Sequence, residues 1–208
     1  MSVLTKLSSQ VGDRSEYSNR KVVLECLDDP GLLDEIAAGL LNKDAALVGD
    51  CAEVLTKVAE QHPDWIVPYV AGLAALLNHK TTRVRWESIH ALSLSAALIP
   101  DTVESMLPKL AELIRHDASV IVRDYTVDIV ANYAAAGKTA AEKAYPILNE
   151  ALTVWNGKQA GHALKGLVNV AIQVPALRDK LCTTGLEYAT SPREVVRKAA
   201  KELLKHLL

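Results

Sequence analysis

The stretch Asp117-Ala-Ser-Val-Ile-Val-Arg123 opens the segment that decides the fold, and that segment runs on to Leu152. Apolar residues at helical spacing predict a first helix over about residues 119–135. Gly137-Lys138 interrupts the pattern, and a second helix is predicted over about residues 140–152. The segment is therefore predicted to be a helical hairpin.

The rest of the chain contains imperfect copies of this hairpin. Relative to Val122-Arg123, a matching pair of residues lies 38 and 74 positions upstream, and 38 and 74 positions downstream. These pairs are Val84-Arg85, Val48-Gly49, Ala160-Gly161 and Val196-Arg197. Spacings of 36 to 38 residues between copies indicate a repeat protein, in which each hairpin buries its apolar face against its neighbours.

A second marker, an apolar or aromatic residue followed by proline, runs in phase with the first at Pro68, Pro108 and Pro146. Proline is tolerated in the first turn of a helix, where its missing N–H would have no partner. We therefore expect these prolines early in the second helix of each pair. Capping-box patterns predict helix starts at three further places, Asp101 with Glu104, Thr139 with Glu142, and Ser191 with Glu194.

These signals divide the chain into five hairpins and a final helix within one continuous domain, residues 1–208. The predicted repeats cover residues 15–42, 43–79, 80–116, 117–153 and 154–190, and a capping helix covers residues 191–208. The predicted first repeat is shorter than the others, as terminal repeats often are.

The hairpins resemble the HEAT-repeat family, within the armadillo-like α-solenoids, in which Asp and then Val-Arg mark the inter-repeat turn and first helix. Asp117, Val122 and Arg123 match all three positions, whereas Gly49 and Gly161 replace the arginine in the second and fifth units. The resemblance implies an all-α, right-handed α-α superhelix of about five hairpins plus a C-terminal capping helix.

Composition suits closely packed helices and argues against some classes of protein. Half of the residues are hydrophobic, phenylalanine is absent and the pI is about 6.3, which does not favour general nucleic-acid binding. No apolar stretch is long enough to span a membrane, and we expect no secretory signal. Three cysteines without CxxC spacing suggest reduced thiols and a cytoplasmic location.

The sequence contains no motif for catalysis or cofactor binding. GxGxxG, GxxxxGK, GxSxG and HExxH are all missing, and the six histidines lack metal-ligand spacing. We therefore expect no enzymatic activity, no cofactor and no metal. His79 and His116 fall at matching inter-repeat turns, where a structural role is expected.

Arginine and tryptophan side chains are the candidate binding residues. Arg85, Arg123 and Arg197 are expected to cap and bridge adjacent repeats, with Asp117 or Asp124 as partners of Arg123. Arg83 and Arg115 flank the same turns and are the first candidates for ligand contact. Trp65 and Trp155 are candidates for lining a groove, since tryptophan often anchors partners.

A non-enzymatic protein-interaction scaffold, binding a protein or peptide along its concave face, is the favoured function. The alternative is a DNA-binding protein or alkylpurine DNA glycosylase, since some HEAT-like proteins of similar length have that activity. The acidic N-terminal half, with a net charge of −6 over residues 1–78, counts against it. A bilin lyase or its partner ranks lower, and the oligomeric state stays open.

Overall fold

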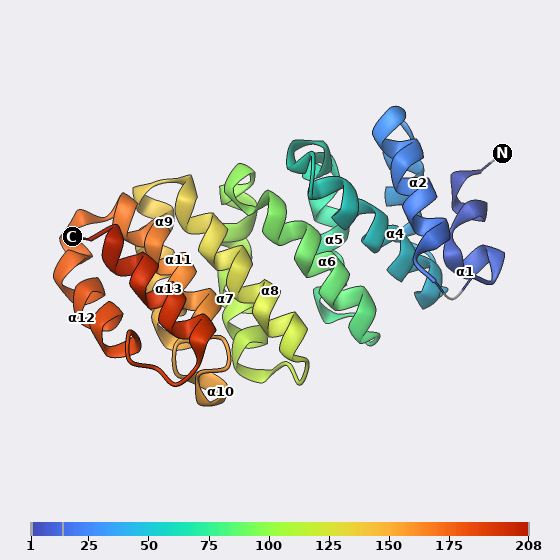
Figure 1. Cartoon of the computed structure of the whole chain (residues 1–208). Helices are drawn as coiled ribbons and strands as arrows, with labels where there is room; N and C mark the ends of the chain where they lie inside the picture. Colours follow the sequence, from blue (N-terminus) through green and yellow to red (C-terminus); the bar gives the residue numbers. More distant parts are fainter. Residues whose placement is uncertain (1, 14, 208) are drawn as a thin grey trace. The chain divides into compact units, whose positions relative to one another are not determined.

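The computed structural model describes residues 2–13 and 15–207, and every regular element within those ranges is a helix. The helices form two compact units, Met1–Ser95 and Ala96–Leu208 (Figure 1). That the whole chain forms a single continuous domain stays a prediction. No helix of the described residues is both long and apolar enough to cross a bilayer.

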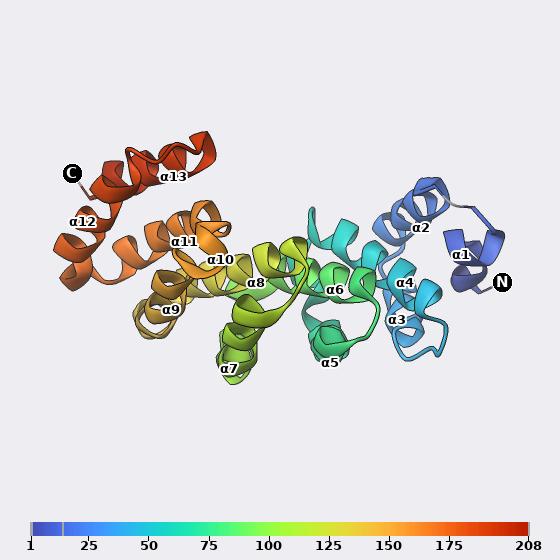
Figure 2. The ribbon, with the colours of Figure 1, turned by 90° about the horizontal axis from the view of Figure 1, so that it is seen from below.

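The first unit has two layers of helices. The helices α2, α4 and α6 pack side by side, while α3 and the segment from η2 through η3 pack on one side of α4 and α6 (Figure 2). Its elements are η1 (Val3–Lys6), α1 (Ser8–Val11), α2 (Tyr17–Asp28), α3 (Leu32–Gly39), α4 (Ala45–Ala59), η2 (Pro63–Tyr69), α5 (Val70–Ala75), η3 (Leu76–Asn78) and α6 (Thr82–Ser95).

The second unit repeats this plan. The helices α8, α11 and α13 form one layer, and α7 and α9 pack against α8 and α11 in a second layer (Figure 2). The helix α12 packs against α13. Its elements are η4 (Ala96–Leu98), α7 (Pro100–His116), α8 (Val120–Tyr133), η5 (Ala134–Ala136), α9 (Lys138–Ala151), α10 (Val154–Gly157), α11 (Ala160–Gln173), η6 (Pro175–Leu177), α12 (Arg178–Tyr188) and α13 (Glu194–Lys205).

The hairpin predicted from residues 117–152 is confirmed as α8 and α9. The Ser119 hydroxyl accepts a hydrogen bond from the N–H of Val122 and caps α8. Gly137 separates the helices with a φ of +143°, a conformation that only glycine adopts without strain. In the third repeat, Val84, Ile89 and Leu92 of α6 are fully buried.

The prediction for the three in-phase prolines is wrong. Pro108 lies in the interior of α7, Pro146 in the interior of α9, and Pro68 inside η2. The two α-helices begin earlier than predicted, at Pro100 and at Lys138. Burial of the face formed by residues such as Leu110 and Leu148 outweighs the one hydrogen bond that each interior proline removes.

The three predicted capping boxes are also wrong. The N-cap positions of α7, α9 and α13 are Ile99, Gly137 and Arg193, and none of them accepts a side-chain capping bond. Glu104 instead pairs with Lys143, which comes from the next helical pair. A carboxylate that can reach a neighbouring helix is no longer available to its own N-terminus, and sequence spacing does not reveal that competition.

The capping role predicted for the Val-Arg arginines is confirmed. Arg85 donates to the main-chain oxygen of His79 over 2.8 Å, Arg197 donates to that of Ser191 over 2.8 Å, and Arg123 donates to that of Asp117. Each guanidinium therefore satisfies a carbonyl six residues earlier, in the turn that precedes its helix. The bridging role through Asp117 or Asp124 stays a prediction. His79 has its expected turn role, because its Nδ1 accepts from the N–H of Thr81.

Candidate functional site

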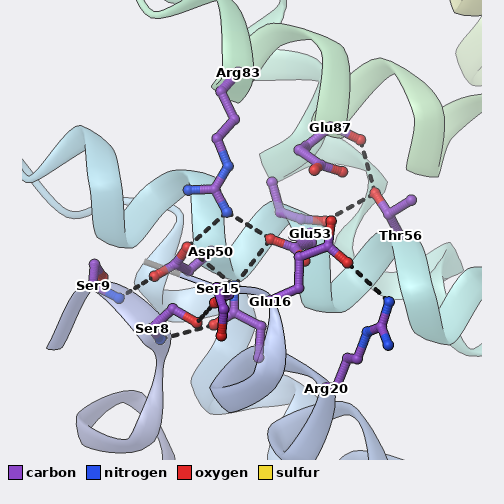
Figure 3. A network of polar contacts seen from close by, with 12 residues as sticks. Ser8, Ser9, Ser15, Glu16, Arg20, Asp50, Glu53, Thr56, Arg83 and Glu87 are labelled. Atoms are coloured by element: carbon purple, nitrogen blue, oxygen red, sulfur yellow. Dashed lines mark hydrogen bonds and ion pairs between the residues drawn. The ribbon is translucent and has the colours of Figure 1, made fainter. Parts of the chain in front are cut away.

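The first unit contains a polar pocket of about 410 Å³ between its N-terminal turns and the α4–α6 pair (Figure 3). Most of its lining side chains are polar: serine hydroxyls, carboxylates, one amide and one arginine, together with a tryptophan and an alanine. The lining residues are Ser8, Ser9, Asp13, Ser15, Glu16, Asn19, Ala46, Asp50, Glu53, Arg83, Trp86 and Glu87.

Asp50 lies at the centre of the pocket wall and is only 1% exposed. Its carboxylate accepts hydrogen bonds from the N–H of Ser9 at 2.7 Å, from Asn19 Nδ2 at 3.1 Å and from Arg83 Nη2 at 2.7 Å. Burial opposes ionisation of this carboxyl, but the hydrogen bonds outweigh burial and hold the pKa of Asp50 below its ordinary value. Asp50 is therefore a fixed negative charge.

Glu53 lies one turn further along α4 and shares both of these side-chain donors. Its Oε2 accepts from Asn19 Nδ2 at 3.0 Å and from Arg83 Nη2 at 2.6 Å. Two nearly buried carboxylates thus meet one guanidinium, and although burial opposes its charge, the pKa of Arg83 is raised. The arginine packs on Gly49, where an added Cβ would lie 3.3 Å from Nη1. Glycine at this repeat position leaves room for the guanidinium.

Glu87 is the third buried carboxyl of the pocket and is 4% exposed. Burial, together with the charge of Glu53, raises its pKa to about 8, although the charges of Arg83 and Lys57 act in the opposite direction. Glu87 is therefore largely uncharged at neutral pH, whereas Asp50 is ionised. The pocket combines a fixed acid with a titratable one.

The arrangement suits recognition of a cation. Arg83 shows how the wall holds a guanidinium, through two carboxylates oriented by Asn19 and the Ser9 amide. Glu16 is exposed at the rim, and the Trp86 ring lines the same space. Among the described residues, no three or more His, Cys, Asp or Glu side chains are grouped so that they could hold a metal ion. The pocket therefore favours an ammonium or guanidinium side chain over an anion.

The structure places Arg83 and Arg115 in ion pairs between repeats. Arg83 lies in the pocket, where it reaches back to the preceding repeat. Arg115 forms a two-pronged pair with Glu150 of the next repeat, at 2.5 and 2.6 Å, which raises the arginine pKa. Both side chains stay partly exposed, at 39% and 44%. Their predicted contact with a ligand stays a prediction.

The two candidate tryptophans are not brought together. Trp65 lies in η2 and stacks on the His62 ring, with centroids 4.0 Å apart. Trp155 is in the second unit, 40% exposed, where its Nε1–H donates to the Ile114 carbonyl over 3.1 Å and its ring covers the Arg123 guanidinium. Its φ of +52° is strained for a bulky residue, and these two contacts hold it there. Whether either residue lines a groove stays a prediction.

Sequence reasoning missed the central residues of the pocket, Asn19, Asp50, Glu53 and Glu87. A signal was present, because Asp50 and Glu53 stand at helical spacing in a mostly apolar stretch of α4. The equivalent positions of the fourth repeat, Asp124 and Val127, carry only one acid. Charged residues on a face expected to be buried are a reason to look for a polar site.

The second unit has a smaller counterpart of the polar wall. Asp128 and His162 lie 2.8 Å apart, and that hydrogen bond raises the pKa of the imidazole despite its burial. Gln159 Nε2 donates to Asp124 over 3.0 Å. A pocket of about 360 Å³ is lined by Val120, Asp124, Lys158, Gly161, His162, Arg193 and Val195.

Comparison with known proteins identifies the fold. Neither protein-family models nor curated proteins match the chain. Solved structures do match, including a designed armadillo repeat protein in complex with the peptide (KR)4, with a TM-score of 0.77, 18% identity and coverage of 99% of this chain and 98% of that one. Computationally designed armadillo repeat proteins for modular peptide recognition match with a TM-score of 0.73, 19% identity and 99% and 98% coverage. The chain therefore has an armadillo-like all-α solenoid fold.

Proposed function

We propose that this protein is a non-enzymatic scaffold that binds a protein or peptide partner, and that the pocket around Asp50 receives a basic side chain of that partner. The observation that carries the proposal is the pair of nearly buried carboxylates, Asp50 and Glu53, held ready around a guanidinium. Similarity to peptide-binding designs supports the general role, since one of them is complexed with a Lys/Arg peptide. The HEAT assignment within armadillo-like solenoids is part of this proposal.

Pre-formed hydrogen bonds explain why such a pocket would discriminate. Asn19 and the Ser9 amide fix the Asp50 carboxylate before any ligand arrives, so little ordering is needed on binding. A basic side chain would gain charge-assisted hydrogen bonds and contact with the Trp86 ring, while an acidic side chain would face several carboxylates. The cysteines are free, which supports the proposal of a cytoplasmic location.

Titration of the protein with an end-capped (KR)4 peptide tests the proposal, with an end-capped (DE)4 peptide for comparison. Glu16→Lys reverses a rim charge without disturbing the buried wall, because Glu16 is 64% exposed and pairs only with Arg20 among the described contacts. We expect it to weaken (KR)4 binding by about tenfold at low salt. Glu112→Lys is the matched control, since Glu112 is 59% exposed in a similar ion pair in the second unit.

Two results would contradict the proposal. Equal binding of the acidic and basic peptides would remove the charge selectivity, and equal weakening by both variants would move the binding site away from this pocket. The same assay with short duplex DNA, intact and alkylated, examines the glycosylase alternative. Steeply salt-dependent DNA binding or release of a modified base would favour that alternative over the peptide scaffold.

A further inference from the structure

Glu87 differs from the other carboxyls of the pocket because, among the described hydrogen bonds, none is donated to its carboxyl group alone. Figure 3 draws one interaction at Glu87, from the Thr56 hydroxyl to its main-chain oxygen, and none to its carboxyl group. That hydroxyl has a single hydrogen, shared at 2.9 Å with Glu87 O and at 3.0 Å with Ala52 O. The Thr56 hydroxyl therefore lowers the pKa of the Glu87 carboxyl only slightly, compared with the rise that burial causes.

The side chain is nonetheless positioned to meet a ligand, because it lines the pocket while being 96% buried. The Arg83 guanidinium forms its ion pairs with Asp50 and Glu53, so its charge is already shared between two other carboxylates. Because burial outweighs the charges of Arg83 and Lys57, this carboxyl stays protonated until a further cation arrives.

We propose that Glu87 couples capture of a basic side chain to release of a proton: it is neutral in the empty pocket and ionises when the ligand cation enters. This inference rests on the proposed function and adds its regulation. The carboxyl O–H bond breaks, the proton goes to solvent, and the resulting carboxylate pairs with the incoming ammonium or guanidinium. Affinity for basic peptides would then rise with pH.

Several charged groups surround Glu87 and set this balance. The other ionisable residues on α6 and on the elements packed against it are Arg83, Arg85 and His90 of α6, Asp50, Cys51, Glu53 and Lys57 of α4, and Asp64 and Tyr69 of η2, while Asp13 and Glu16 also line the pocket. Burial and Glu53 dominate the shift that places the pKa near 8. His90 is an ionisable imidazole on the same helix, so any test must distinguish it from Glu87.

The test is calorimetric titration of the full chain with end-capped (KR)4 peptide in buffers of different ionisation enthalpy, which counts the protons exchanged. We expect release of close to one proton per bound peptide at pH 7 and about a tenth of that at pH 9. Affinity should rise by up to tenfold per pH unit between pH 6 and pH 8. Glu87→Gln should abolish the release and flatten the pH dependence.

The control separates this inference from the function on which it rests. Glu16→Lys should weaken binding at every pH while leaving the proton count unchanged. Binding that Glu16→Lys weakens, but that releases no proton from the wild-type protein, overturns the role of Glu87 alone. Release that persists in Glu87→Gln assigns the proton to another group, such as His90, and also overturns it. Binding that Glu16→Lys does not affect overturns the proposed pocket as well. The wild-type proton count remains decisive if Glu87→Gln does not fold.

Discussion

Asp50 and Asp124 occupy the same place in two copies of the repeat, yet they belong to different kinds of site. Each directly follows one of the residue pairs that mark the repeat, Val48-Gly49 for Asp50 and Val122-Arg123 for Asp124. Each forms a hydrogen bond with the residue that directly precedes the marking pair of the next copy. That residue is Arg83 for Asp50 and Gln159 for Asp124. In the first unit Asp50 and Arg83 are both charged, and Glu53 also binds Arg83. In the second unit the Asp124 carboxylate bonds to the neutral amide of Gln159.

The difference shows what a repeat fixes and what it leaves free. The backbone register brings the two positions within hydrogen-bonding distance in both units, whatever side chains they carry. The side chains then decide whether the contact gathers further charge, as around Arg83, or stays a local structural bond, as at Gln159. In the second unit the buried cation is Arg123, which the Trp155 ring covers. The arginine of the first unit thus lines a polar pocket, whereas that of the second unit is covered by an aromatic ring.

Removing Arg123, the cation that the Trp155 ring covers, should have the largest effect on stability. Arg123 is 1% exposed, caps the preceding turn and stacks on Trp155, so Arg123→Ala should leave a large cavity and an unsatisfied carbonyl. We expect a loss of about 3–4 kcal/mol in the free energy of unfolding, measured by denaturant titration. A loss no larger than that of Arg83→Ala would show that burial of this arginine contributes little.

Exchanging the partners of the two aspartates tests the comparison directly. Arg83→Gln leaves Asp50 and Glu53 without their shared cation and should cost about 2–3 kcal/mol. This estimate lies at the low end for a broken buried pair, because Arg83 is 39% exposed. Gln159→Arg, the reverse change, brings a larger, charged side chain into a fully buried position beside Asp124, so we expect it to destabilise the protein as well, by about 1–3 kcal/mol. No loss from Arg83→Gln would mean that the acidic wall has no special need for its cation, and no loss from Gln159→Arg would mean that the second unit accommodates an arginine equally well.

Stability of the first unit should fall as the pH rises. The Glu87 pKa is about 8 in the folded protein and 4.5 in the unfolded chain, so the folded state holds the extra proton between these values. Its stabilising contribution is complete below about pH 4.5 and is lost as the pH rises through 8, with about 1.4 kcal/mol lost between pH 7 and pH 9. Denaturant titrations at both pH values should show this loss in the wild type and much less of it in Glu87→Gln. A wild-type profile no steeper than that of the variant would contradict the raised pKa.

The smallest effect is expected from separating the two contacts of Trp155. Trp155→Phe keeps an aromatic ring over Arg123 but removes the hydrogen bond from Nε1 to the Ile114 carbonyl. We expect a loss of about 1 kcal/mol, read from the same denaturant titration. A loss approaching that of Arg123→Ala would mean that the hydrogen bond, rather than the stacking, holds the strained turn.

Much of the architecture could be predicted because it follows from local periodicity. The spacing of Val84, Val122 and Val196 located equivalent helices, and the break at Gly137 separated α8 from α9. Helix starts could not be placed equally well. Capping signals around Ser191 compete with tertiary bonds, and Arg193 instead reaches the carbonyls of Gly157 and Lys158 in the preceding repeat.

The sequence alone determined that the chain is an all-helical repeat with an acidic beginning, because repeat spacing and charge are written residue by residue. Only the tertiary structure decided that Asn19, Asp50, Glu53, Arg83 and Glu87, drawn from three helices, share one pocket. It also decided that Asp50 is ionised and Glu87 is not. The physical reason is that a carboxyl's charge depends on which donors and how much water surround it, and both are set by helices distant in sequence.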